Sequence, residues 1–155
     1  MKVIFLDFDG VLNSEKYVRG CEGYGVVIDP SRMVLLKQIV EKTDAVIVLS
    51  TSWREHWDAD LNKADSTGRQ IHELFTTYGL CIADKTPALR KGREHDIRSW
   101  LDQHHVEKFV VLDDRLMSAD FLNGHMVKTS NYFDGLDESD VQRAIDILNE
   151  TESDA

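Results

Sequence analysis

The stretch VIFLDFDGVLN, from Val3 to Asn13, places an apolar run directly before two acidic residues. A continuous apolar run of this length is typical of a strand that is covered on both faces of a sheet. The run ends in Asp7 and Asp9, and Gly10 follows at once. Because unpaired charge is costly to bury, a strand that carries two carboxylates to its end predicts a functional use for them.

The rest of the chain repeats this pattern of short apolar runs separated by helical patterns. Further strands are expected in DAVIVLS (44–50), GLCIAD (79–84) and KFVVLDD (108–114), with a weaker one in GHMVKTS (124–130). Helices are expected over 30–42, 93–105 and 138–150; the first has Asp29 as N-cap and Pro30 at its first position. This alternation predicts a three-layer α/β/α sandwich with a mainly parallel, Rossmann-like sheet.

The length of 155 residues favours one domain, which we place at residues 1–149. Residues 14–29 have three glycines and little periodicity, and we expect a flap or small hairpin over the strand ends. The acidic tail at 150–155 is expected to be flexible.

Charge and composition narrow the class of partner. The formal net charge of -10 argues against an extended nucleic-acid surface or an anionic membrane as partner, but it does not exclude a local basic pocket. No run is long enough for a membrane span, and the N-terminus does not resemble a signal peptide. Cys21 and Cys81 are far apart, and we expect free thiols in a cytoplasmic protein.

Polar side chains follow three of the predicted strands. Asp7 and Asp9 end the first, the hydroxyl cluster at 50–52 ends the second, and Asp113 and Asp114 end the fourth. In open parallel sheets ligands bind beyond the carboxyl ends of the strands, so these groups are expected to converge. Four carboxylates at one place repel one another unless a cation lies among them, and oxygen ligands favour Mg²⁺.

Three further roles for the acidic residues fit the sequence less well. A single Asp after a strand often only caps a turn, but paired acids on two strands favour a site. A calcium loop needs glycine at its sixth position, whereas DFDGVLNSE has it at the fourth. A phosphate-receiving signalling domain, with Asp84 as the modified residue, fits the Asp-x-Asp-Gly spacing poorly.

Three of these segments resemble the motifs of the haloacid dehalogenase (HAD)-like hydrolases. DFDGVLN resembles the first motif, VIVLS the second and VVLDD the fourth, in matching order to about residue 130. LSTSWR and REHDIRSWL also resemble a small group of these hydrolases associated with RNA-repair proteins. Neither 13–29 nor the stretch after Asp84 is long enough for a large cap domain.

The resemblance implies roles for the acidic residues. Asp7 would be the nucleophile that forms an aspartyl-phosphate, and Asp9 the general acid and then the base. Gly10 would let the backbone turn sharply. Asp7, the backbone carbonyl of Asp9, and Asp113 would hold Mg²⁺, with Asp114 close by or acting through water.

The resemblance also implies roles for the groups that bind phosphate. Ser50 would hydrogen-bond a phosphoryl oxygen. The residues expected to contact the substrate are Gly10, Thr51 and Arg54. The third motif needs a cation before the helix that leads to the fourth strand, and RKGREHDI offers Arg90, Lys91 and Arg93. Lys91 is the simplest match, whereas Arg93 fits if the helix is aligned on DIRSWL.

The three tryptophans have different expected surroundings. Trp100 lies on an apolar helical face and is expected in the core. Trp53 and Trp57 follow the second motif, and for these two residues stacking on a base and packing in the core both stay open.

These features together imply a Mg²⁺-dependent phosphatase acting on phosphomonoesters. The expected partner is a phosphorylated substrate, such as a small molecule, a nucleotide or a polynucleotide end. The alternatives are a phosphoprotein phosphatase and a non-catalytic Mg²⁺-binding regulatory module of the same fold.

Overall fold

The computed structural model describes residues 1–22, 25–130 and 132–151. Its five strands form one sheet, in which all paired neighbours are parallel, in the order β3-β2-β1-β4-β5. Their bounds are β1 Lys2–Leu6, β2 Val46–Leu49, β3 Ile82–Lys85, β4 Lys108–Asp113 and β5 Met126–Lys128. Strand β1 falls inside the apolar run KVIFLDF (2–8), and β2, β4 and β5 fall inside the runs that predicted them. Strand β3 extends one residue beyond its run, so the parallel α/β fold is confirmed.

Strand β1 lies at the centre of the sheet, between β2 and β4. Leu6 is in register with both Leu49 and Leu112, so the three strands end at the same level. After β1 the chain builds β2 and β3 on one side and then returns to add β4 and β5 on the other. In such sheets the place where the order reverses is where ligands bind.

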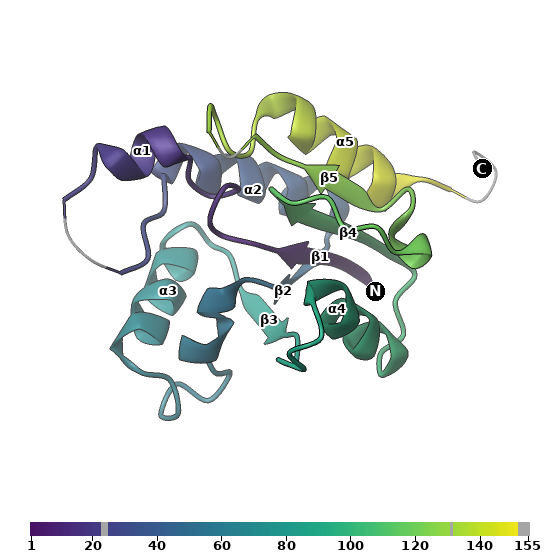
Figure 1. The fold of residues 1–155 in the computed structure, drawn as a ribbon, viewed down its shortest axis with the longest axis horizontal. Helices are drawn as coiled ribbons and strands as arrows, with labels where there is room; N and C mark the ends of the chain where they lie inside the picture. The colour runs from purple at the N-terminus through teal and green to yellow at the C-terminus, as the bar shows by residue number, and fades with distance from the viewer. Residues whose placement is uncertain (23–24, 131, 152–155) are drawn as a thin grey trace.

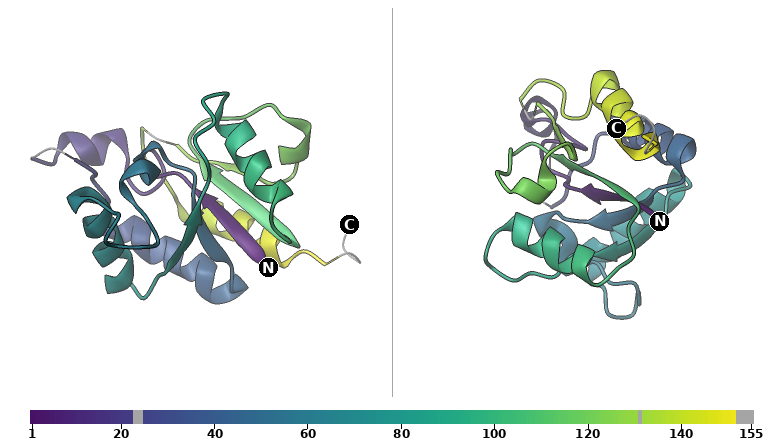
Figure 2. Two further views of the ribbon diagram at one scale, coloured as in Figure 1. Left: turned by 90° about the horizontal axis from the view of Figure 1, so that it is seen from below. Right: turned by 90° about the vertical axis from the view of Figure 1, so that its right-hand side faces the viewer.

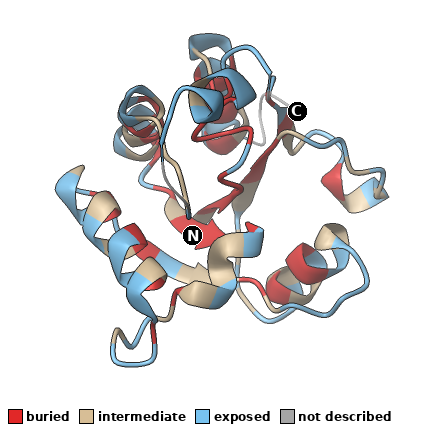
Figure 3. Cartoon of the chain, turned by 60° about the vertical axis from the view of Figure 1, so that its left-hand side comes forward, coloured by how far each residue is buried: buried red, intermediate tan, exposed pale blue. Residues whose placement is uncertain are grey.

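Helices cover both faces of this sheet (Figures 1 and 2). Their bounds are α1 Glu15–Arg19, α2 Pro30–Thr43, α3 Ser66–Thr77, α4 Arg93–Asp102 and α5 Glu138–Asn149, with short 3-10 helices η1 Ser52–His56 and η2 Asp120–Leu122. Helices α2, α3 and α5 share the larger core, and α4 packs Ile97 and Trp100 into the smaller core on the other face. Burial is therefore concentrated in the strands and on the inner sides of the helices (Figure 3).

The helix starts follow local chemistry. Asp29 accepts a hydrogen bond from the Ser31 N–H at 2.9 Å, and Pro30 is the first residue of α2, as predicted. Trp100 is buried edge-on against Phe5, with ring centroids 5.5 Å apart, which confirms its expected place in the core. Both cysteines are free and exposed, in agreement with the sequence.

Two segments differ from expectation. The segment over the strand ends, expected to be a loop or small hairpin, contains helix α1, because Ser14 caps one helical turn by accepting a hydrogen bond from the Tyr17 N–H; residues 23 and 24 lie outside the described ranges. Helix α3 was not singled out from the sequence; its Asp65 cap and the buried pair Ile71 and Phe75 define it. Figure 1 shows α1 lying on the side toward which the chain leaves β1.

The single-domain assignment of residues 1–149 and the flexible tail at 150–155 stay predictions, and 152–155 lie outside the described residues. No helix in the described ranges has both the length and the apolar character that crossing a membrane requires. The same ranges contain no separate cap domain over the carboxyl ends of the strands.

Candidate active site

Three carboxylates meet at the carboxyl edge of the sheet. Asp7 directly follows β1, Asp113 is the last residue of β4, and Asp114 comes next. One carboxylate oxygen of each lies within 4.8 Å of those of the other two. Asp7 and Asp113 are buried. The matched ends of β1 and β4 thus bring together acids that are more than a hundred residues apart in the chain.

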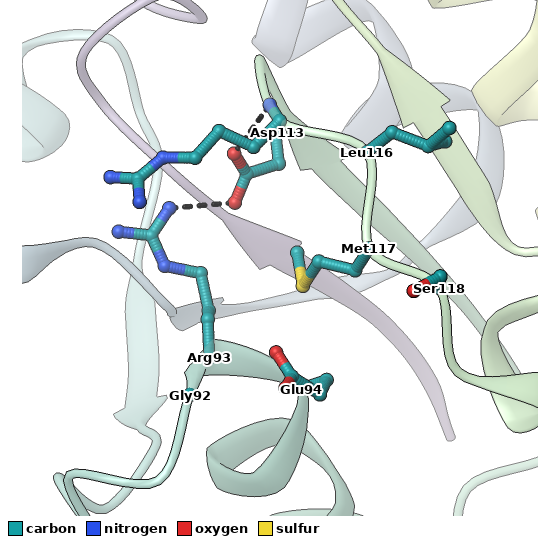
Figure 4. A pocket seen from close by; sticks show the side chains of 8 residues that line it. Gly92, Arg93, Glu94, Asp113, Leu116, Met117 and Ser118 are labelled. Carbon is teal, nitrogen blue, oxygen red and sulfur yellow. Dashed lines mark hydrogen bonds and ion pairs between the residues drawn. The ribbon is translucent and has the colours of Figure 1, made fainter.

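Arg93 lies between two of these acids. It is the first residue of α4, and its Nη1 is 3.0 Å from Asp7 Oδ2 and 2.7 Å from Asp113 Oδ2. Figure 4 shows Arg93 pointing at Asp113 across the site. Burial opposes the charge of the guanidinium, but Asp7 and Asp113 outweigh burial and raise the pKa of Arg93. Arg93 is therefore a fixed cation within the acidic cluster.

The cluster carries more negative charge than Arg93 neutralises. Burial raises the pKa of Asp7 to about 7; Arg93 opposes this shift, whereas Asp113 and Asp114 add to it. In the described ranges this is the only group of three acidic, histidine or cysteine side chains close enough to share a metal ion. An all-carboxylate donor set with excess negative charge fits a hard divalent cation such as Mg²⁺.

Asp9 lies apart from the cluster. Its Oδ1 accepts a hydrogen bond from Asn13 Nδ2 at 3.1 Å, and its Oδ2 accepts one from Trp53 Nε1 at 2.9 Å. Gly10 has a φ of 82°, a conformation that glycine adopts without strain, and its N–H donates to Asn13 Oδ1. The Asp9 carboxylate is not a member of the three-acid group, so its predicted metal contact through the backbone carbonyl stays a prediction.

The side chain of Ser50 is buried where β2 ends. Its backbone N–H donates to Leu6 O at 2.9 Å, which places it beside the start of the Asp7 turn. Its Oγ has no hydrogen-bond partner among the described residues, although the residue is only 1% exposed. Buried hydroxyls without partners are rare, and one at the end of a central strand suits an oxygen of a bound phosphoryl group.

The structure gives Thr51 and Arg54 different partners from those expected. Thr51 is fully buried, and its Oγ1 caps η1 by accepting a hydrogen bond from the Trp53 N–H. Arg54 Nη2 lies 3.0 Å from Asp96 Oδ2, while Nη1 donates to Thr51 O. The guanidinium of Arg54 thus clamps the loop after β2 to helix α4, and its expected contact with substrate stays a prediction.

The three candidate cations for the third motif have different surroundings in the structure. Arg90 and Lys91 are exposed in the turn before α4, whereas Arg93 reaches the acids. The difference arises because α4 begins at Arg93, with Gly92 at a φ of 118° turning the chain into the helix.

Two cavities border members of the cluster. One, of about 340 Å³, is lined by Arg93, Asp113 and Arg115, among others (Figure 4). The other, of about 430 Å³, is lined by Asp9 and Asp114 together with Arg19 of helix α1. The short helix in the predicted flap thus forms part of a cavity wall beside Asp9.

Two supporting residues were missed from the sequence. Asp96 is buried in α4 and holds Arg54. Thr129 follows β5; its hydroxyl donates to Gly10 O and its N–H donates to Asp113 O. The hydroxyl pair that ends GHMVKTS resembles the cluster after the second strand and was the available signal for Thr129.

Comparison with known proteins gives one match. The sequence model of the family described as "HAD domain in Swiss Army Knife RNA repair proteins" matches residues 3–141. Neither the comparison with curated proteins nor that with solved structures found a match. The matched range contains β2 to β5, all of β1 except Lys2, and every residue of the acidic cluster.

Proposed function

The chain belongs to the family of HAD domains found in Swiss Army Knife RNA repair proteins, and from this we propose that it is a Mg²⁺-dependent phosphatase. It hydrolyses phosphomonoesters through an aspartyl-phosphate on Asp7. The observation that carries the proposal is the buried cluster of Asp7, Asp113 and Asp114 with Arg93 fixed against two of its members.

The first step transfers the phosphoryl group to Asp7. An oxygen of the Asp7 carboxylate forms a bond to phosphorus, and the bond from phosphorus to the leaving oxygen breaks. The electron pair stays with the leaving oxygen, which takes the proton of the Asp9 carboxyl group. Arg93, which contacts Asp7, and the unpartnered Ser50 hydroxyl are the groups that would stabilise the phosphoryl oxygens.

The second step restores Asp7. A water oxygen attacks phosphorus and gives its proton to the Asp9 carboxylate, while the bond between phosphorus and the Asp7 oxygen breaks. Inorganic phosphate leaves, and Asp7 is again a carboxylate. The carboxylates of Asp7, Asp113 and Asp114 would hold Mg²⁺, which supplies neutralisation of the charge on the transferring group.

The substrate class follows from what surrounds the cluster. The family's description as part of RNA repair proteins supports a nucleotide or the end of a nucleic acid. Arg115 and Arg19 line the two flanking cavities and give local positive charge in a protein of net charge -10. The absence of a large cap over the described strand ends leaves room for a bulky leaving group.

Hydrolysis of p-nitrophenyl phosphate tests the activity. We expect turnover with Mg²⁺, none in a chelator, and none in Asp7→Asn. A lack of turnover in a protein that still binds Mg²⁺ would make the chain a non-catalytic metal-binding module. Among natural substrates, a panel of nucleotides, oligonucleotide ends, sugar phosphates and phosphopeptides tests the class, and preference for sugar phosphates or phosphopeptides would contradict it.

A further inference from the structure

The contact between Trp53 and Asp9 gives Trp53 a role beyond packing. We propose that Trp53 is a positioning residue for proton transfer: its indole N–H holds the Asp9 carboxyl group where it meets the leaving oxygen. This inference rests on the proposed function, because it concerns the proton that Asp9 gives to the leaving group.

Both oxygens of Asp9 are held by N–H donors. Trp53 Nε1 lies 2.9 Å from Oδ2, and Asn13 Nδ2 lies 3.1 Å from Oδ1. Asp9 is an exposed residue, and an exposed carboxyl group without such contacts samples several rotamers. Two donors on opposite oxygens fix both the direction and the plane of the carboxyl group, which is the condition for efficient proton transfer.

The two donors come from different parts of the fold. Asn13 is 2% exposed and is itself held by Val27 O and the Gly10 N–H, so it anchors Asp9 to the loop after β1. Trp53 belongs to η1, which directly follows β2 and Ser50. Trp53 therefore links Asp9 to the segment that follows β2 and Ser50.

The indole of Trp53 can orient the Asp9 carboxyl group, but it cannot relay a proton. Its N–H group is a donor only, so it cannot accept the proton that Asp9 carries. Its hydrogen bond to Oδ2 must be shared or released when that oxygen delivers a proton to a leaving group. Trp53 is not among the residues that line the 430 Å³ cavity, but its hydrogen-bond partner Asp9 is, so the indole N–H supports Asp9 from outside that cavity.

A neighbouring tryptophan provides a matched control. Trp57 is 3% exposed within the larger core, and its Nε1 has no hydrogen-bond partner in the described part of the chain. Trp53 is half-buried and lies 5.8 Å from the His56 ring, with its N–H directed to Asp9. Of the two residues for which the sequence left packing and stacking open, Trp57 packs, and Trp53 also binds a predicted catalytic acid.

Substrates whose leaving groups differ in basicity can distinguish a positioning role of Trp53 from a merely structural one. An alkoxide leaves only if it is protonated, whereas a dinitrophenolate leaves without a proton. The value of kcat/KM reports the steps up to departure of the leaving group. Loss of the Trp53 N–H is therefore expected to slow an alkyl phosphate far more than a dinitrophenyl phosphate.

The experiment compares Trp53→Phe, Trp57→Phe and the unmodified protein, each with Mg²⁺, on these two substrates. Trp53→Phe should lower kcat/KM for the alkyl phosphate about tenfold or more, which is part of the roughly 100- to 10,000-fold that general acid catalysis typically contributes. The value for the dinitrophenyl phosphate should stay within about twofold of that of the unmodified protein. Trp57→Phe should leave the ratio of the two values unchanged. Partial unfolding lowers both values equally, so the ratio does not depend on the folded fraction.

Two results on the variants would overturn the inference alone. An equal loss on both substrates, or no loss on the alkyl phosphate, removes the positioning role while the phosphatase activity stands. A further loss when Trp53→Phe is added to Asp9→Asn also removes it, because residues acting through one group are not additive. If the unmodified protein hydrolyses neither substrate, the proposed function and this inference fail together.

Discussion

Arg93 and Asp7 form a buried ion pair at the carboxyl end of the central strand, with Nη1 3.0 Å from Oδ2. The same nitrogen lies 2.7 Å from Asp113 Oδ2, so one cation is shared between two acids that would otherwise repel each other. The proposed nucleophile is therefore oriented by the first residue of helix α4.

Removal of this cation should damage both activity and stability. Arg93→Ala leaves two buried carboxylates without the cation that they share, which we expect to cost about 3 kcal/mol of the free energy of unfolding and at least about 100-fold in kcat/KM. Lys91→Ala, at an exposed position two residues earlier, is the control and should stay within about 0.5 kcal/mol. Urea unfolding and phosphatase assays decide this, and a larger loss of activity in Lys91→Ala would reverse the assignment.

Ser50 should separate activity from stability. Because its buried Oγ has no partner in the described ranges, Ser50→Ala is expected to leave the free energy of unfolding unchanged or slightly higher. Loss of one donor to the transition state should lower kcat about 100-fold. Ser52→Ala, at an exposed position, is the matched control. A Ser50→Ala protein that is clearly less stable yet fully active would show that the hydroxyl serves the fold.

The raised pKa of Asp7 should make the metal-free protein less stable as the pH rises, because the folded state holds the Asp7 proton more tightly than the unfolded state does. The pKa of Asp7 is about 7 in the folded chain against an ordinary 3.8, so between these values the folded state keeps a proton that the unfolded state has lost. The free energy of unfolding in a chelator therefore falls from about pH 4 to about pH 7 as far as this group contributes. Asp7→Asn should flatten that fall, and an unchanged slope in Asp7→Asn would contradict the prediction.

The same acid should link metal binding to pH. Because Mg²⁺ needs the ionised cluster, the rise in melting temperature at a fixed Mg²⁺ concentration should be larger at about pH 8 than at about pH 5. Calorimetric or fluorescence melting measures this. An equal rise at both values would mean that Mg²⁺ stabilises the protein at another place.

Glycine should be required at position 135, because the backbone there lies close to the carbonyl oxygens of Asn13 and Val11. It has a φ of 64°, and a Cβ there would lie 2.4 Å from Asn13 O and 2.9 Å from Val11 O. Gly124, with a φ of 79° and nothing within 4 Å, is the control for backbone strain alone. Gly124→Ala should cost about 1 kcal/mol and Gly135→Ala at least about 2 kcal/mol more in urea unfolding. Equal costs would show that the loop gives way to the added methyl group.

The sheet and the acidic cluster could be predicted from sequence because both depend on local patterns. Continuous apolar runs are typical of parallel strands covered on both faces, and the residues that follow such strands meet at one edge. The meeting of Asp7 and Asp113 could be predicted from that rule alone, without any knowledge of long-range contacts. Helix α3 was not predicted because only three of its residues are buried, Gly68, Ile71 and Phe75, and one of them is a glycine.

The partners of the loop residues could not be predicted, because spacing in the sequence does not fix where a side chain of an irregular segment lies. Trp53 reaches Asp9 across 44 positions, and Arg54 reaches Asp96 across 42. The choice between Lys91 and Arg93 depended on the residue at which α4 begins, and boundaries of this kind are the least certain part of a sequence pattern.

The phosphorylated intermediate offers the most direct measurement of the central claim. Asp9→Asn, which lacks the base for the second step, is mixed with a radiolabelled phosphomonoester that has a good leaving group and Mg²⁺, then quenched in acid. We predict label on the protein, released by hydroxylamine as expected of an acyl phosphate, and mapped to the peptide that contains Asp7. Turnover by the unmodified protein without any labelled Asp7 peptide in Asp9→Asn, or label on another residue, would contradict the proposed mechanism.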